Sequence, residues 1–325
     1  MENNLGVVHW QSGRLQHAVP HLTHALVLNR RTGNAHGEVA NLGNLAVILR
    51  ELGRLRMSAA HVTTSMAITR RISYPIAEAN GHTSLGKLAH EQGRFDTALD
   101  LLTTAVRRYR ELGSQGGEAD ALSILAGVFR DPGRSREVYA IAVTAVALAA
   151  EVADRPAEAV ALNTPATICL RLGDHQAAID HAWQALTVAV TAGNRYPEIE
   201  ALISLAHCHR DQPTEGVEYA RQVLNLSRRG EYRVLEAQAL TILAMAHLDL
   251  GRIDRALPEA SQAVTIQRET GHRLGEAHAH HVLGLTLAAA RLPAVAETES
   301  RRATDLCTRI GVPPLGQALF GLLSS

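Results

Sequence analysis

The chain has 325 residues, and its 32 lysine and arginine side chains are balanced by 32 aspartates and glutamates. This balance excludes a protein that is drawn to nucleic acid or to an anionic membrane by its net charge. Apolar residues make up 46% of the chain and aromatic residues only 3%, so the core must be packed from Leu, Ala, Val and Ile.

Three cysteines, Cys169, Cys208 and Cys307, stand far apart without paired spacing, which fits thiols in a reducing compartment. No apolar run reaches the roughly 18 residues of a membrane-spanning helix. The first residues have neither the basic start nor the apolar core of a signal peptide. We therefore expect a cytoplasmic protein without a membrane partner.

The first helix starts with the chain, where Leu5 and Val8 begin an apolar stripe that no earlier repeat covers. Because the ends of stacked repeats normally carry a polar cap, we expect a fragment or a shortened member of its class. A Gly-Arg pair ends this helix and returns at a spacing of 40 residues. The turns concerned are Gly13-Arg14, Gly53-Arg54, Gly93-Arg94, Gly133-Arg134 and Gly173-Asp174, with Gly251-Arg252 a further 78 residues on.

The third repeat shows the two predicted helices most clearly. Apolar residues recur every three to four positions over residues 78–92, which predicts an amphipathic helix. A second stripe covers residues 95–112, and Gly113 ends it as a C-terminal cap. Two helices joined by a tight turn form an antiparallel hairpin.

Two further registers repeat with the turns. Leu followed by Gly or Ala stands eight residues before the first turn, at Leu5-Gly6, Leu45-Ala46, Leu85-Gly86, Leu125-Ala126, Leu205-Ala206, Leu243-Ala244 and Leu283-Gly284. A small residue stands twelve positions after the turn, at Ala25, Ser65, Ala105, Ala145, Ala185, Ala263 and Ala303. The fifth copy has Pro165, which we expect to kink or shorten its helix. Asp211-Gln212-Pro213 replaces the sixth turn, and Pro313-Pro314 precedes a predicted apolar capping helix.

These registers resemble the tetratricopeptide repeat, although the copies are nearer to 40 residues than to the usual length of about 34. The resemblance implies an all-α fold, a right-handed α-solenoid (superhelix) of about eight hairpins. We expect one domain over residues 1–325, with repeats at 1–33, 34–73, 74–113, 114–153, 154–193, 194–231, 232–271 and 272–311 and a capping helix at 312–325. HEAT and armadillo arrays, the alternative at this repeat length, lack the Leu-Gly, turn and Ala registers.

Residues 117–134 and 272–292 further resemble the repeat arrays of actinomycete transcriptional regulators, those of the Streptomyces antibiotic regulatory protein (SARP) and NB-ARC types. In these regulators the repeats follow a winged-helix DNA-binding domain and a nucleotide-binding switch domain, neither of which is in this chain. The resemblance implies a sensing or partner-binding role, with other domains of the same regulator as partners. It implies no direct nucleic-acid binding by this region.

Candidate catalytic groups have structural interpretations. Seven glutamates recur near the start of the first helix of successive repeats, at Glu38, Glu78, Glu118, Glu158, Glu198, Glu236 and Glu276. Seven equivalent carboxylates fit favourable helix-dipole contacts of about 0.3–1 kcal/mol each better than acid-base catalysis. His17, His21 and His24 share a helix face without a nearby carboxylate, and neither a nucleophile elbow nor a phosphate loop is present. We expect no enzyme, no metal and no cofactor.

The first helices of tetratricopeptide arrays line a concave groove. Transferring that pattern implies partner-binding side chains at Arg50, Asn80, Lys87, His90, Arg130, Asn163, His207, Arg210, Gln238, His278 and His281. Arginine suits a peptide carboxylate because its planar fork binds both oxygens, although the Lys-Asn clamp of chaperone-binding arrays has no match. We predict a protein- or peptide-binding scaffold, the sensor or effector region of an actinomycete regulator. The alternative is a self-associating architectural array, a homo-oligomer formed through the uncovered first repeat.

Overall fold

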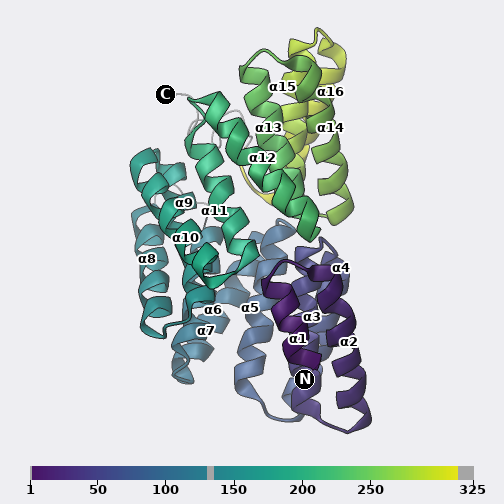
Figure 1. Ribbon diagram of the computed structural model, residues 1–325, viewed down its shortest axis with the longest axis vertical. Helices are drawn as coiled ribbons and strands as arrows, with labels where there is room; N and C mark the ends of the chain where they lie inside the picture. Colours follow the sequence, from purple (N-terminus) through teal and green to yellow (C-terminus); the bar gives the residue numbers. More distant parts are fainter. Residues whose placement is uncertain (1, 130–134, 314–325) are drawn as a thin grey trace.

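The computed structural model describes residues 2–129 and 135–313. Over these residues the regular secondary structure is α-helix alone, and the helices pair into eight antiparallel hairpins (Figure 1). In chain order the pairs are α1 (Glu2–Gln11) with α2 (Leu15–Arg31), α3 (Ala35–Glu51) with α4 (Leu55–Arg71), α5 (Pro75–Glu91) with α6 (Phe95–Glu111), α7 (Gln115–Val128) with α8 (Ser135–Glu151), α9 (Arg155–Leu172) with α10 (His175–Ala192), α11 (Arg195–Cys208) with α12 (Pro213–Gly230), α13 (Arg233–Asp249) with α14 (Ile253–Thr270), and α15 (Arg273–Ala289) with α16 (Pro293–Ile310). We call the first member of each pair helix A and the second helix B. The predicted all-α solenoid is confirmed.

Most of the described turns close on a residue with left-handed backbone. At the glycines of these turns φ lies between 66° and 78°, a region that glycine enters without a Cβ penalty. The amide of Gly53 donates to the carbonyl of Arg50 at 2.8 Å, which satisfies one of the last carbonyls of α3. Where the second turn lacks glycine, Ser73, Ala153 and Glu231 adopt the same conformation, with φ of 52°, 54° and 58°. The hairpin geometry therefore continues where the glycine period is broken.

The Leu-Gly register follows from the packing of helix A on helix B. Gly6 and Gly86 face Leu22 and Leu102, and a Cβ on either glycine would stand 2.6 or 2.7 Å from the Cγ of that leucine. Both leucines are fully buried, and the seven small residues of the helix B register are buried as well. Close approach of the paired helices therefore depends on the small residues that the sequence repeats.

Pro165 does not shorten its helix, contrary to expectation. The helix α9 runs unbroken through this residue for 18 residues. It packs against α7, α8, α10 and α11, and this packing outweighs the cost of about 3 kcal/mol that proline carries in a helix interior.

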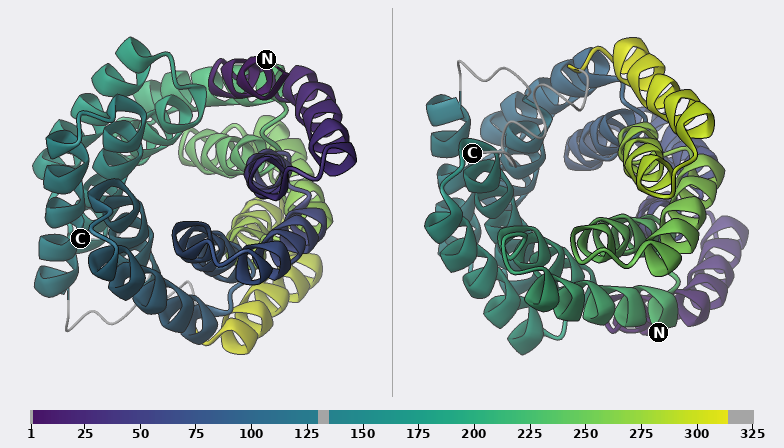
Figure 2. Two further views of the ribbon diagram at one scale, coloured as in Figure 1. Left: turned by 90° about the horizontal axis from the view of Figure 1, so that it is seen from below. Right: turned by 90° about the horizontal axis from the view of Figure 1, so that it is seen from above.

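The hairpins wind around a central axis (Figure 2). Seen from the N-terminal end, the chain turns clockwise as it recedes, which makes the superhelix right-handed (Figure 2). After about one turn a second level of hairpins lies on the first, so that α12–α16 stand above α1–α4 (Figure 1). Among the described helices, none is long and apolar enough to cross a membrane.

We call the contact between the two levels the seam. The glycines at the A–B turns of the first three hairpins meet residues at the ends of later helices across it, namely the start of α11 and the ends of α14 and α16. A Cβ on Gly13, Gly53 or Gly93 would stand 2.8 Å from Arg195 Cγ, 2.5 Å from Thr270 Cγ2 or 2.5 Å from Ile310 Cγ2, respectively. Gly173 and Gly251, at the same turn position in other repeats, have no such neighbour within 4 Å. The repeated glycine thus has a second role in the first three hairpins, which the sequence period does not predict.

An apolar core extends across the seam. Leu15 and Leu52 of the first two hairpins belong to one buried cluster with Tyr232 and Leu235 of the sixth and seventh. At the N-terminal end, the side chains of Leu5 and Val8 are 41% and 55% exposed. The predicted capping segment from residue 314 onward lies outside the described residues.

Candidate functional site

The central axis of the superhelix contains a cavity of about 520 Å³. Its lining comes mainly from the A helices α5, α7, α9, α11, α13 and α15. Seven predicted groove residues line it, namely Lys87, His90, Asn163, His207, Arg210, Gln238 and His278. The described residues Arg50, Asn80 and His281 lie outside the lining, and Arg130 lies outside the described residues.

Helix α11 gives the cavity its longest polar face. Tyr196, Glu200 and His207 follow one another on the lining side of this helix, and Arg210 lines the cavity two residues after its last residue, Cys208. At a rise of about 1.5 Å per residue, Tyr196 and His207 stand about 16 Å apart along the axis. The face is therefore long enough for a short extended peptide.

Arg50 lies in a buried ionic cluster at the seam rather than in the open groove. Its guanidinium contacts Glu91 at 2.8 Å, Glu51 at 3.5 Å and the hydroxyl of Tyr196 at 3.2 Å. Glu51 also accepts a hydrogen bond from the indole of Trp10 at 2.8 Å. We call these five residues the Arg50 cluster. It joins α1, α3 and α5 of the first level to α11 of the second.

Burial raises the pKa of Glu51 to about 7, because the opposing effects of Arg50 and the Trp10 hydrogen bond only partly offset it. The ordinary value is 4.5, so folding takes up a proton between these two pH values. The contribution of Glu51 to the free energy of unfolding is therefore full below about pH 4.5 and falls as pH rises to about 7.

We expect Glu51→Gln to remove this pH dependence. Between pH 5 and pH 8 the free energy of unfolding of the wild type should fall relative to that of the variant by up to about 3 kcal/mol. Urea unfolding followed by circular dichroism at both pH values measures the difference. Glu111→Gln, at an exposed side chain in two surface ion pairs, is the control. A wild type and Glu51→Gln variant with parallel pH profiles would contradict the role assigned to Glu51.

Two more carboxylates lie close to the Arg50 cluster. Burial raises the pKa of Glu200 and of Asp120, while Lys87 and Arg50 lower both. The ammonium of Lys87 lies 5.8 Å from the ring centre of Tyr196, over the ring that Arg50 also covers at 5.1 Å. Glu51, Glu91 and Glu200 at this end of the cavity are buried or half-buried, whereas Asp120 is exposed.

The opposite end of the α11 face is basic. Burial, followed by the charge of Arg210, lowers the pKa of His207 to about 4, so His207 is neutral at pH 7. Arg171 donates to the carbonyl of Phe129 at 2.8 Å, and burial lowers its pKa. Burial also raises the pKa of Asp249, which Arg210 opposes. Arginines thus carry the positive charge at this end.

Two amides in the lining have atoms without a hydrogen-bond partner among the described residues. Asn163 is 7% exposed, and its Oδ1 is unpaired. Gln267 is 1% exposed, and both of its amide atoms are unpaired. By contrast, Asn80 accepts a hydrogen bond from the hydroxyl of Tyr109 at 2.6 Å. Burial raises the pKa of that tyrosine to about 12, so it remains a donor.

Sequence reasoning missed several lining residues, among them Gln267, Tyr196 and Arg171. Gln267 stands on a B helix, which the groove pattern does not sample, and Tyr196 stands in the first turn of its A helix. Arg171 stands at the repeat position of Glu51 and Glu91, one residue after the predicted groove position that Arg50 and Arg210 occupy. Of these three, only Arg171 had a signal in the repeat pattern.

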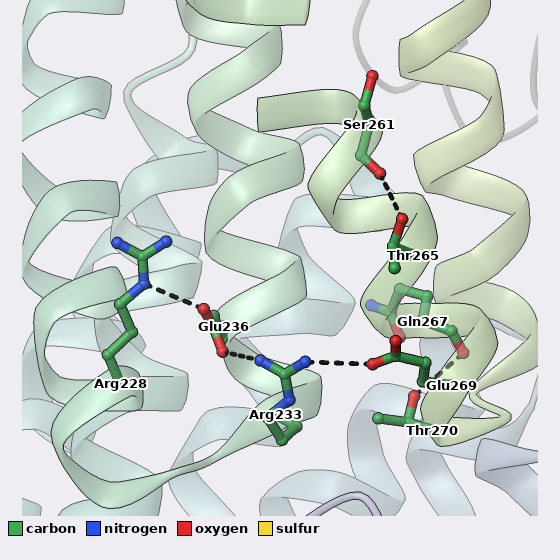
Figure 3. A network of polar contacts seen from close by, with 8 residues as sticks. All are labelled: Arg228, Arg233, Glu236, Ser261, Thr265, Gln267, Glu269 and Thr270. Carbon is green, nitrogen blue, oxygen red and sulfur yellow. Dashed lines mark hydrogen bonds and ion pairs between the residues drawn. The ribbon is translucent and has the colours of Figure 1, made fainter. Parts of the chain in front are cut away.

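The seven repeated glutamates are held by arginines. Glu236 pairs with Arg228 at the end of α12, at 3.0 Å, and with Arg233 at the start of α13, at 2.6 Å. Arg233 also reaches Glu269 at 3.2 Å (Figure 3). Each of the other six glutamates pairs with one arginine. For Glu38, Glu78 and Glu118 this arginine lies at the end of the preceding helix B, and for Glu158, Glu198 and Glu276 it lies at the start of the same helix A. Since the arginines are partly exposed, each pair contributes at most about 1 kcal/mol.

The histidine face of α2 has a carboxylate nearby, which corrects the sequence-based expectation. Glu2 lies 2.7 Å from Nδ1 of His21 and 3.8 Å from Nδ1 of His24. The ring of His9 stacks on those of His17 and His21, with centres 5.6 and 5.3 Å apart. Within the part of the chain that the structure describes, no three His, Cys, Asp or Glu side chains are placed to hold a metal ion.

Tetratricopeptide repeat models match residues 1–71 and 237–270. A search of curated proteins finds no match. Among solved structures, a Rap protein complexed with competence and sporulation factor has a TM-score of 0.70 at 13% identity, over 96% of this chain and 89% of that chain. The Rap conjugation gene regulator of the plasmid pLS20, in complex with the Phr* peptide, has a TM-score of 0.67 at 10% identity, over 90% and 79%.

A signal transduction ATPase of the STAND class with a tetratricopeptide repeat sensor, from Pyrococcus horikoshii, has a TM-score of 0.55 at 12% identity. That match covers 98% of this chain and 49% of the ATPase. At these identities the solved structures share the fold alone. The matched segments show tetratricopeptide repeats at residues 1–71 and 237–270, and the solved structures show the all-α solenoid fold.

Proposed function

We propose that this protein is a non-catalytic scaffold that binds a peptide, or an extended segment of a protein, inside its superhelix. The observation that carries the proposal is the cavity of about 520 Å³, lined by polar side chains from six successive A helices. Rigid side chains presented by adjacent repeats along one trough suit an extended chain. Two of the similar solved structures hold competence and sporulation factor and the Phr* peptide, respectively.

We propose further that the chain is the sensor region of an actinomycete transcriptional regulator and acts in the cytoplasm. The resemblance of residues 117–134 and 272–292 to such repeat arrays supports this, as does the repeat sensor of the similar STAND protein. Its partner would be a peptide signal or another domain of the same regulator. A pull-down with domains encoded next to this chain, followed by mass spectrometry, tests whether the partner is another domain of the same regulator.

A bulky ring inside the cavity should weaken peptide binding. Thr167 lines the cavity, and its hydroxyl donates to the carbonyl of Asn163, four residues earlier. Thr187, on the exposed side of α10, makes the same bond to Trp183 and lies outside the lining. We expect Thr167→Trp to weaken retention of a pentapeptide library about tenfold or more, and Thr187→Trp to change it less than about twofold.

Affinity selection on the full chain, with mass spectrometry of the retained peptides, measures this effect. Circular dichroism melting of both variants shows whether they are equally folded. Equal retention by Thr167→Trp and Thr187→Trp would place the peptide site outside the cavity.

A further inference from the structure

One end of the cavity has more negative than positive charge. The carboxylates there are Glu51, Glu91 and Glu200, and the cations that act on them are Arg50 and Lys87. Three carboxylates against two cations leave one negative charge over when all are ionised. Charges that protein surrounds are costly unless they are paired, so this end favours a positively charged guest.

Arg50 is already paired at this end. Arg50 contacts Glu51 and Glu91 through its two terminal nitrogens. Only Oε1 of Glu91 takes part, and its Oε2 has no hydrogen-bond partner among the described residues. Both Glu91 and Glu200 line the cavity. Both carboxylates therefore belong to the wall of the space in which a ligand would lie.

An independent acceptor points to the same place. The amide nitrogen of Asn163 donates to the carbonyl of Pro197 at 3.0 Å and to that of Ala159 at 3.3 Å. These two bonds fix which end of the amide is the oxygen, and this buried oxygen has no partner among the described residues. Pro197 precedes Glu200 by one turn of α11. The Asn163 amide therefore lies within about one helical turn of Glu200.

We propose that the acceptor site formed by Glu91, Glu200 and the Asn163 amide oxygen binds a cationic nitrogen group of the ligand, an alkylammonium or a guanidinium. This inference rests on the proposed peptide-binding function and specifies the chemistry of the peptide. Several N–H donors of one cation can satisfy carboxylate and amide oxygens together, in charge-assisted hydrogen bonds. A metal ion would need a closer grouping of ligands than the described residues provide.

The cationic group can come from the amino terminus of the peptide or from a lysine or arginine side chain. A pentapeptide library in four arms separates these sources: free or acetylated amino terminus, each with and without lysine and arginine, all with an amidated carboxyl end. Affinity selection on the full chain, followed by calorimetry of retained peptides, gives the affinities. We expect arms with a cationic group to bind about tenfold or more tighter than the acetylated arm without lysine and arginine.

Matched variants test the site itself. Glu200→Gln should reduce this preference about tenfold, whereas Glu218→Gln, on the exposed side of α12, should leave it unchanged. Gln238 lines the cavity on the neighbouring helix α13, at the repeat position of Glu200. Gln238→Glu therefore adds a carboxylate there and should strengthen the preference for cationic peptides. A gain of this kind cannot arise from misfolding.

Three outcomes overturn the inference in distinguishable ways. Retention of all four arms with equal affinity would refute cation recognition while the peptide-binding function stands. Retention of no arm would refute both. A preference that survives in Glu200→Gln and does not grow in Gln238→Glu would place cation recognition elsewhere in the chain.

Discussion

Replacing Arg50 by methionine should lower the free energy of unfolding by about 3–5 kcal/mol at pH 8. Arg50 is 7% exposed, and its removal would leave Glu51 and Glu91 buried with no arginine beside them. The cost should shrink at pH 5, because Glu51 is then protonated. Urea unfolding of the full chain, followed by circular dichroism at both pH values, measures the loss.

Arg70→Met is the matched control for Arg50→Met. Arg70 also pairs with a glutamate, Glu78 at 3.0 Å, but its side chain is 61% exposed. An exposed pair contributes about 1 kcal/mol or less, so this variant should unfold close to the wild type. Equal losses in the two variants would mean that the Arg50 cluster stabilises the seam no more than a surface ion pair does.

Gly53→Ala should destabilise the chain by about 2–5 kcal/mol, the sum of two costs. Gly53 has a φ of 73°, where a Cβ costs about 1–2 kcal/mol. The new methyl group would also stand 2.5 Å from Thr270 Cγ2 across the seam, and overpacking of this kind costs about 1–3 kcal/mol more. Part of the strain should be relieved by separation of the two levels.

Gly251→Ala isolates the backbone cost, since its φ is 69° and no such neighbour lies within 4 Å. Thermal unfolding of both variants gives the difference in stability, and small-angle X-ray scattering gives the radius of gyration. We expect a larger radius for Gly53→Ala and an unchanged one for Gly251→Ala. Identical stabilities and radii would show that the seam yields without cost to an added methyl group.

The hairpins and their stacking could be predicted because they depend on neighbouring residues. A helix, its turn and the next helix fit within 40 residues, so the Gly-Arg period and the small residues at Ala105 and Ala145 repeat with them. Missing glycines did not interrupt the pattern, because Ser73 and Glu231 adopt the same backbone. Local information of this kind is copied into every repeat.

The site was predicted in part for the same reason. Lys87, Asn163 and Gln238 line the cavity because inward positions of helix A transfer from repeat to repeat. Arg50 departs from this pattern because Tyr196, 146 residues later, meets it across the seam. Contacts between distant repeats leave no period in the sequence. Neither the Arg50 cluster nor the position of Gln267 in the cavity lining could therefore be predicted.

The seam also constrains how the gene can change. In an open array, a hairpin can be duplicated or deleted because each unit touches only its neighbours. Here Gly13, Gly53 and Gly93 meet Arg195, Thr270 and Ile310, each about 180 to 220 positions further along the chain. Inserting one hairpin between them would rotate every later unit and bring the wrong residues opposite these glycines. The number of hairpins in this interval should therefore stay fixed, while single residues on the outer surface drift.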